Sequence, residues 1–266
     1  MYSDCHGHWT DPRVSEELRQ TWMRDSLNKN LDLFMEAGVN PEGWQRQIAL
    51  QKQYPKNFKN AFGLHPYFVA ENDEATCEQA IDDLAKIINL ASGLGETGLD
   101  FREKYIQNPN NVSDDVRDRQ IVFFENQIQL AKAFKKPLVL HVVRAHSEAL
   151  KVLNIWEADE VGGMVHAFNS SLEVAEQYMN LNFLISVGGA VTHEKNKKLM
   201  EAVKAIPLEK LLLESDCPDQ APEGWAEPQN SPLSVLLVAK TVAEIKQMPL
   251  DLVLEKTTEN FKMLFT

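Results

Sequence analysis

Two histidines separated by one residue stand near the start of the chain, within Asp4-Cys5-His6-Gly7-His8. In an extended strand, alternate side chains point to the same face, so we expect His6 and His8 to lie side by side. Two imidazoles that point into the interior at the C-terminal end of a buried strand need a partner, and a divalent metal ion binds both. The alternative is a surface pair near a frayed terminus, and the motif alone does not decide between the two.

Four more candidate ligands come at the ends of apolar runs. They are Glu96 in Gly95-Glu96-Thr97-Gly98, His141 after Leu140, His166 after Val165, and Asp216 shortly after Leu211-Leu212-Leu213. Each of them alone is better explained as a core polar group with satisfied hydrogen bonds. Their joint occurrence at the ends of different predicted strands favours an active site.

Eight short apolar runs predict the strands that would position these residues. They are Tyr2–Cys5, Leu31–Met35, Asn60–Gly63, Gly93–Glu96, Leu138–Val143, Gly163–Phe168, Phe183–Val187 and Leu211–Asp216. Near-continuous Leu, Val and Ile runs are typical of parallel strands buried on both faces. The fold class that we expect is α/β, a TIM-type (β/α)8 barrel forming a single domain over residues 1–266. An open doubly wound sheet is less favoured, because no Gly-x-Gly-x-x-Gly follows the first strand.

Amphipathic stretches between the strands predict the helices. These stretches are Asp118–Phe134, Leu172–Leu181, Asn196–Ala205, Ser231–Lys246 and Leu250–Leu264. Two polar, turn-rich loops, Lys104–Asp114 and Cys217–Pro232, follow the fourth and eighth predicted strands. Both would therefore lie at the same end of the barrel, where the first could overhang a site.

Composition limits the classes of function. The chain has 266 residues, 27 basic and 39 acidic side chains, and a formal net charge of −12. A broad basic surface for nucleic acid is therefore excluded, and a phosphate-bearing substrate needs a local site, whose positive charge metal ions could supply. The three cysteines form no close pair, the N-terminus lacks a signal-peptide pattern, and no apolar run is long enough to span a bilayer. We expect a cytoplasmic protein without membrane contact.

The candidate set contains four imidazoles and two carboxylates, more than a single catalytic zinc ion uses. It fits two divalent metal ions that share a carboxylate, an arrangement that recurs in phosphoester hydrolysis. Mixed nitrogen and oxygen ligands favour zinc, manganese or another first-row ion. The composition of the set leaves the identity of the metal, including magnesium, open.

With these motifs in place, the sequence resembles the TatD family of metal-dependent hydrolases, within the amidohydrolase-like barrels. Seven motifs occur in order along essentially the whole chain. They are Asp4-Cys5-His6-Gly7-His8, Gly63-Leu64-His65-Pro66-Tyr67, Gly95-Glu96-Thr97-Gly98-Leu99-Asp100, Pro137-Leu138-Val139-Leu140-His141, His166-Ala167-Phe168, Leu213-Glu214-Ser215-Asp216 and Asn260-Phe261-Lys262-Met263-Leu264-Phe265. Two segments, Phe168-Asn169-Ser170-Ser171 and Asn230-Ser231-Pro232, depart from the family pattern. Neither departure touches a ligand position, so both bear on substrate preference.

The resemblance implies a set of metal ligands and a DNase activity. The implied ligands are His6, His8, Glu96, His141, His166 and Asp216. Glu96 would bridge the two ions, with His6, His8 and Asp216 on one ion and the two later histidines on the other. Phosphodiester cleavage in DNA is the chemistry that the family suggests.

The mechanism that we expect is attack by a metal-activated water, with Asp216 and Glu96 as the catalytic residues. Asp216 would accept the proton of that water while holding its metal ion. Asp4 either orients one of the histidines or caps the first strand, two interpretations that the sequence leaves equal.

Two further residues are candidates for substrate binding. His65, in Gly-Leu-His-Pro, would contact substrate or bond the loop backbone. Arg144, just after His141, could clamp a phosphate or pair with a surface carboxylate. His146 and His193 lack such placement, and we expect both to be exposed.

The sequence leaves three functions open. The first is a DNase, and single-stranded DNA or DNA ends suit an acidic protein as substrate because a few local contacts are enough to bind them. The second is hydrolysis of another ester, a lactone, an amide or an aminoacyl-tRNA bond, since activated water serves all of these. The phosphotriesterase branch is disfavoured because Glu96 stands where those relatives carry a carboxylated lysine. The third is a barrel that binds metal without turnover, which the intact ligand set disfavours. The sequence does not indicate the oligomeric state.

Overall fold

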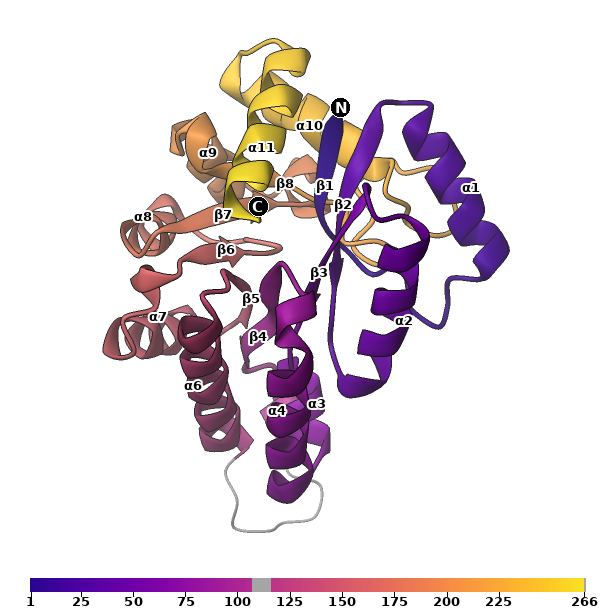
Figure 1. The fold of residues 1–266 in the computed structure, drawn as a ribbon. Helices are drawn as coiled ribbons and strands as arrows, with labels where there is room; N and C mark the ends of the chain where they lie inside the picture. The colour runs from indigo at the N-terminus through magenta and orange to yellow at the C-terminus, as the bar shows by residue number, and fades with distance from the viewer. Residues whose placement is uncertain (107–115, 266) are drawn as a thin grey trace.

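A computed structural model describes residues 1–106 and 116–265. Its centre is an eight-stranded parallel sheet in which each strand pairs with the next in chain order, from β1 to β8. Helices lie outside the strands around the ring (Figure 1). The strands are β1 Tyr2–Gly7, β2 Leu31–Ala37, β3 Phe58–Phe62, β4 Gly93–Asp100, β5 Leu138–Val143, β6 Gly163–Val165, β7 Phe183–Val187 and β8 Leu211–Leu213. The expected TIM-type barrel is thus confirmed.

The helices follow the strands around the barrel. The α-helices are α1 Glu16–Leu27, α2 Pro41–Gln53, α3 Pro66–Glu71, α4 Glu74–Ile87, α5 Glu103–Ile106, α6 Val116–Phe134, α7 His146–Ile155, α8 Leu172–Asn180, α9 Lys197–Ala205, α10 Ser234–Lys246 and α11 Leu250–Leu264. Short 3-10 helices are η1 Ile88–Leu90, η2 Ala158–Glu160, η3 Gly189–Thr192 and η4 Leu208–Lys210. Among the described helices, none is both long and apolar enough to cross a membrane.

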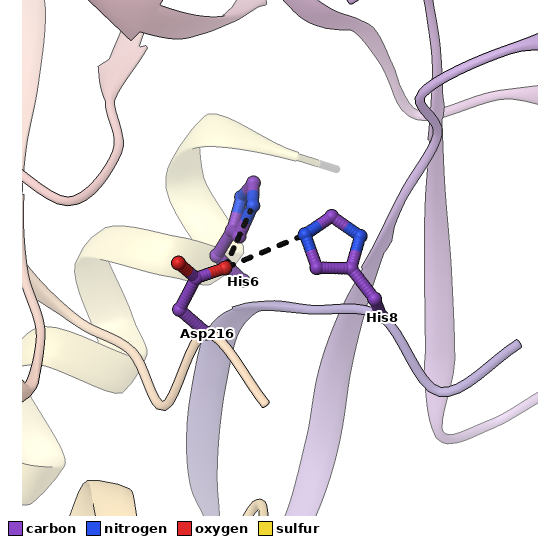
Figure 2. A group of neighbouring side chains, drawn as sticks. All are labelled: His6, His8 and Asp216. Carbon is purple, nitrogen blue, oxygen red and sulfur yellow. Dashed lines mark ion pairs between the residues drawn. The ribbon is translucent and has the colours of Figure 1, made fainter. Parts of the chain in front are cut away.

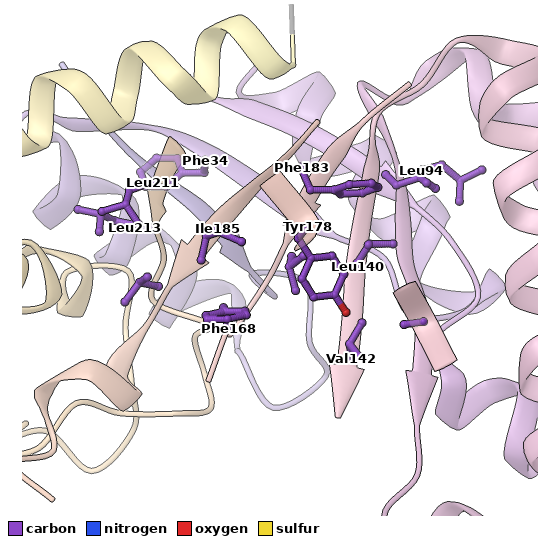
Figure 3. Packing of buried hydrophobic residues seen from close by; sticks show 14 of the residues in the cluster. Phe34, Leu94, Leu140, Val142, Phe168, Tyr178, Phe183, Ile185, Leu211 and Leu213 are labelled. Atoms are coloured by element: carbon purple, nitrogen blue, oxygen red, sulfur yellow. The ribbon is translucent and has the colours of Figure 1, made fainter. Parts of the chain in front are cut away.

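Alternation along the strands divides the core into two layers. In β2, Phe34 packs outward in the larger cluster between strands and helices, while Leu33 and Met35 belong to a smaller cluster inside the barrel. Figure 3 shows part of the larger cluster. Phe261 and Phe265, from α11 and the residue after it, belong to the inner cluster. Since α11 also packs against β1 and β8, it covers one end of the barrel and leaves the other end for a site.

The seam between β8 and β1 closes the ring without a regular ladder. The amide of Asp216 donates to the His6 carbonyl over 3.0 Å, and the amide of His8 donates to the Cys217 carbonyl over 2.7 Å. Asp4 adds a side-chain link, because its carboxylate accepts from the amide of Ser215 at 2.8 Å and from the Ser215 hydroxyl at 2.6 Å. The first strand and the segment after the last strand are therefore held together at the residues that were predicted to bind metal.

Several element boundaries differ from the sequence prediction. β5, β7 and α11 have the predicted bounds, whereas β6 ends at Val165 and β8 at Leu213, each three residues earlier than predicted. In both places the predicted strand included the candidate ligand, whereas the backbone leaves the extended conformation there, with Ala167 and Asp216 at positive φ. In the predicted loop Lys104–Asp114, residues 104–106 belong to α5, and residues 107–114 lie outside the described residues.

Candidate metal centre

All six predicted metal ligands converge at the open end of the barrel, together with His65. Every one of them is buried except His8, whose side chain is 18% exposed. Three overlapping groups have ligand atoms within 4.8 Å of one another: His6, His8 and Asp216; His6, Glu96 and His166; and His65, Glu96 and His141. Figure 2 shows the first group, in which both imidazoles face the Asp216 carboxylate.

Glu96 stands at the centre of the cluster, and its two oxygens face different histidines. Oε1 lies 3.4 Å from Nε2 of His6 and 3.3 Å from Nε2 of His8. Oε2 lies 2.9 Å from Nε2 of His166 and 3.4 Å from Nδ1 of His141. One carboxylate is therefore shared between two ligand groups, as a bridging ligand would be.

The second carboxylate belongs to the first group alone. Oδ1 of Asp216 lies 3.6 Å from Nε2 of His6 and 3.4 Å from Nε2 of His8. Two ligands on one tetrahedral zinc ion, each at about 2.1 Å, stand roughly 3.4 Å apart. The separations within this group therefore match those of atoms that share one metal ion.

Buried polar atoms without hydrogen-bond partners support the same interpretation. Among the described residues, both ring nitrogens of His6 and Oε1 of Glu96 are buried and make no hydrogen bond. Leaving such atoms unsatisfied costs about 1–3 kcal/mol each, so a native protein provides a partner for them. A divalent cation between Nε2 of His6 and Oε1 of Glu96, which lie 3.4 Å apart, would satisfy these two atoms together, so the residues fit a metal.

The charges in the cluster are strongly coupled. Burial would raise the pKa of Glu96, but the imidazoles of His166 and His6 outweigh it and hold that pKa well below its usual range. Burial would lower the pKa of His8, but Asp216 and Glu96 outweigh it and raise that pKa to about 10. The cluster thus favours an ionised Glu96, and without metal it favours protons on His8 and His166, whose pKa values are both raised.

The strand periodicity explains why the later histidines point inward. Val139 and Met164 belong to the inner cluster, and His141 and His166 stand two residues further along the chain from each. His141 extends this inward face of β5 toward the open end, and His166 does the same just past β6. Their nitrogens, Nδ1 of His141 and Nε2 of His166, lie 3.0 Å apart.

Three residues to which the sequence assigned no role lie against the candidate ligands. Nε2 of His141 lies 3.2 Å from the buried Asp100 carboxylate, which is also bound by Arg102. Nδ1 of His166 lies 3.6 Å from the buried Glu214 carboxylate. Carboxylates in this position fix the orientation and tautomer of a metal-binding imidazole.

The third is Gln220, whose amide donates to Oδ2 of Asp216. Asp216 and Gln220 both adopt the left-handed backbone conformation, with φ of 53° and 52°. Alternation along β4, which places Glu96 and Asp100 on one face, was a signal for Asp100. No comparable periodic signal existed for Gln220, which lies in the loop after β8.

Asp4 has the capping role rather than contact with an imidazole. Its Oδ1 accepts from the backbone amide of His6 at 3.4 Å, in addition to its bonds to Ser215. Burial raises the pKa of Asp4 to about 8, although these hydrogen bonds oppose the shift.

His65 bonds the loop backbone with one nitrogen and faces the cluster with the other. Its Nδ1 accepts from the amide of Tyr67 at 3.0 Å, which caps α3, and its Nε2 lies 3.7 Å from Oε2 of Glu96. Burial and the neighbouring His141 lower the pKa of His65 well below its usual value, so the ring is neutral. Because Nδ1 accepts, the proton of the neutral ring is on Nε2, where it can be donated into the site.

A cavity of about 860 Å³ opens above the cluster. Arg144 is exposed and lines it, and no carboxylate within residues 1–106 and 116–265 forms an ion pair with this guanidinium. His146 also lines the cavity, and the expectation that it is exposed is wrong. The ring is half-buried, its Nδ1 lies 3.1 Å from the Tyr178 hydroxyl, and burial lowers its pKa. His193 is exposed as expected.

Comparison with known proteins identifies the family. Residues 3–266 match the family described as TatD related DNase. YabD of Bacillus subtilis, an uncharacterized metal-dependent hydrolase, is 32% identical over 270 residues, covering 100% of this chain and 99% of that protein. The crystal structure of YjjV, a TatD homologue of Escherichia coli, has a TM-score of 0.87 at 26% identity, over 99% of this chain and 97% of that one.

A TatD family protein of Entamoeba histolytica has the same fold, with a TM-score of 0.85 at 18% identity, over 99% of this chain and 97% of that one. The family match spans nearly the whole chain, and the cluster of buried histidines and carboxylates is suited to metal. The chain therefore belongs to the TatD family of metal-dependent hydrolases.

Proposed function

We propose that this protein is a divalent-metal-dependent deoxyribonuclease that hydrolyses phosphodiester bonds in DNA. The family description supports this substrate class. The observation that carries the proposal is that the two oxygens of Glu96 face different histidines. Oε1 faces His6 and His8, whereas Oε2 faces His141 and His166. A carboxylate shared in this way suits a pair of metal ions, which is a recurring arrangement for phosphodiester hydrolysis.

The proposed ligand assignment follows these groups. His6, His8 and Asp216 would hold one ion, His141 and His166 would hold the other, and Glu96 would serve both through its two oxygens. Zinc, manganese and magnesium are the candidate ions, and when bound they would activate a water molecule and neutralise charge on the phosphate oxygens.

Asp216 is the proposed proton acceptor. Its Oδ1 faces the interior of the cluster, whereas Oδ2 is held by the Gln220 amide. This bond fixes the rotation of the carboxylate, so that Oδ1 remains directed at Nε2 of His6 and of His8, the side chains with which Asp216 would hold a metal ion. A carboxylate fixed in this way can take a proton without first reorienting.

Arg144 and His65 are the proposed substrate contacts. The Arg144 guanidinium is exposed at the cavity and can bind two phosphate oxygens at once. His65 can donate from Nε2 to an oxygen of the same phosphate, since its Nδ1 is occupied by the Tyr67 amide. With a net charge of −12, the protein suits single-stranded DNA or DNA ends better than long duplexes.

The three cysteines are buried and free. This state is in keeping with the reducing conditions of the cytoplasm, which is the compartment that we propose.

Cleavage of labelled single-stranded DNA tests the proposed activity. The purified protein is treated with EDTA and then supplied with Mg²⁺, Mn²⁺ or Zn²⁺, with Glu96→Ala and His141→Ala in parallel. We expect metal to restore cleavage in the wild type and neither variant to respond. If the wild type binds metal but leaves DNA intact, the nuclease assignment is wrong, and esters, lactones and aminoacyl-tRNA become the substrates to assay.

A further inference from the structure

A second cavity adjoins the one above the metal centre. Its volume is about 670 Å³, and it lies among the loops that follow β6, β7 and β8. Asn169 and Gln220 line both cavities. Because Gln220 also binds Asp216, the second cavity begins one side chain away from the proposed proton acceptor.

Amide side chains with free hydrogen-bonding capacity line the boundary between the cavities. Nδ2 of Asn196 donates to Oδ1 of Asn169 at 2.9 Å and to the Ala190 carbonyl at 3.1 Å. Among the described residues, nothing bonds Nδ2 of Asn169 or Oδ1 of Asn196. The cavity therefore presents one donor and one acceptor, a combination that suits sugar hydroxyls and the edges of nucleobases.

The wall formed by the segment after β7 carries positive charge. Residues 193–198 read His-Glu-Lys-Asn-Lys-Lys, so three lysines stand within four positions of a chain whose net charge is −12. Lys195 lines the cavity, and none of the three lysines forms an ion pair with a carboxylate of the described residues. On the facing wall, Glu223 lies 3.8 Å from Nδ1 of His193 and accepts from the Glu194 amide at 3.2 Å, so its charge is partly engaged.

The opposite rim of the main cavity carries both signs of charge, since Arg46 lines it together with carboxylates. Asp11, Glu42 and Asp219 line it there. Arg13 binds both Asp11 and Asp219, so it is already engaged between two carboxylates. A charged strand leaving the metal centre therefore meets mixed charges toward β1, and three lysines without ion pairs to the described residues after β7.

We propose that the second cavity is a subsite for the nucleotide next to the scissile bond, in which Lys195 binds a backbone phosphate and the Asn169–Asn196 pair binds the sugar or base. This subsite rests on the proposed nuclease function. It adds the side of the metal centre toward which the DNA strand would extend, which is the side of the loops after β6, β7 and β8. A substrate that extends beyond the scissile phosphate gains these contacts, whereas a small phosphodiester does not.

Hydrolysis of two substrates by Lys195→Ala tests the subsite. The substrates are labelled single-stranded oligothymidylate and the small diester bis(p-nitrophenyl) phosphate, and Lys204→Ala, at the far end of α9, is the matched control. For Lys195→Ala we expect the ratio of kcat/KM for oligothymidylate to that for the small diester to fall about fivefold near 0.1 M salt. That figure follows from one lost phosphate contact on single-stranded DNA, worth about 0.7 in the slope of log K against log salt. The Lys204→Ala ratio should equal that of the wild type.

A binding assay separates failure of the subsite from failure of the nuclease proposal. The anisotropy of fluorescein-labelled oligothymidylate is titrated in EDTA, where no cleavage occurs, and the salt slope of Lys195→Ala should be smaller by about 0.7. Lysine-dependent binding without cleavage in any metal would keep the subsite and reject the nuclease. Cleavage with equal ratios and salt slopes for Lys195→Ala and Lys204→Ala would overturn the subsite and keep the nuclease. Neither binding nor cleavage would overturn both.

Discussion

Replacing Asp100 tests whether a buried carboxylate behind His141 sets the affinity of the metal centre. Asp100 is fully buried, and its Oδ2 lies 3.2 Å from Nε2 of His141. A hydrogen bond to a charged group contributes about 1.5–3 kcal/mol, whereas one to a neutral group contributes roughly 0.5–1.5 kcal/mol. Asp100→Asn can keep a neutral bond to the imidazole, so it should lose about 1.4 kcal/mol, equivalent to about tenfold in metal affinity. Asp100→Ala loses the whole bond and should weaken binding about tenfold to a hundredfold.

Metal affinity of the EDTA-treated variants, measured by competition with a fluorescent chelator, provides the assay. Arg102, the other partner of Asp100, is 34% exposed, so water can solvate its charge when the carboxylate is gone. Asp83→Asn is the matched control, because Asp83 forms a surface ion pair with Lys86 at 2.7 Å and such pairs contribute little. If both Asp100 variants bind metal within twofold of the wild type, while remaining folded, the positioning role is refuted.

Four further outcomes are expected. Glu96→Gln retains the shape of the side chain but loses its charge. We therefore expect elemental analysis after dialysis to show that both metal ions are lost. Loss of one ion alone would contradict the bridging assignment. In the metal-free protein the pKa of His8 is about 10. Because only the neutral imidazole binds metal, the metal affinity should increase about tenfold per unit rise in pH for each proton released. Calorimetry in buffers of different ionisation enthalpy counts the protons released, and zero release at pH 7 would contradict the raised pKa. Gln220→Met removes the donor to Asp216 and should lower kcat about tenfold with a smaller change in KM, whereas a pure rise in KM would argue against control of the carboxylate. Saturating metal should raise the thermal midpoint of the wild type more than that of His6→Ala, and equal shifts would place the metal elsewhere.

The sequence predicted the barrel and the convergence of the six candidate ligands because both depend on local pattern. An apolar run followed by a histidine, as at Leu140-His141, indicates a buried strand and the residue that lies toward its open end. The same pattern overestimated β6 and β8, since the backbone just past each ladder turns away from the extended conformation, with Ala167 and Asp216 at positive φ. Local pattern thus located the site better than it located the strand ends.

The supporting contacts depend on geometry that sequence spacing does not encode. Asp100 approaches His141 only because β4 and β5 are neighbours in a particular register, which pairs Gly98 with His141. Gln220 reaches Asp216 through a loop in which both residues have positive φ. Neither an aspartate nor a glutamine in the sequence predicts that conformation. His146 was misjudged for a related reason, because its partner Tyr178 lies on another helix.

Because the proposed metal centre spans the seam between the first and last strands, metal binding should also stabilise the closed barrel. His6 and His8 come from one end of the chain and Asp216 from near the other, at the only junction in the described ring that lacks a regular ladder. A metal ion bound by these three residues would link the two sides of that junction. We therefore expect the amides of His8 and Asp216 to exchange with solvent more slowly in the loaded protein, and the metal-free barrel to open first along this line.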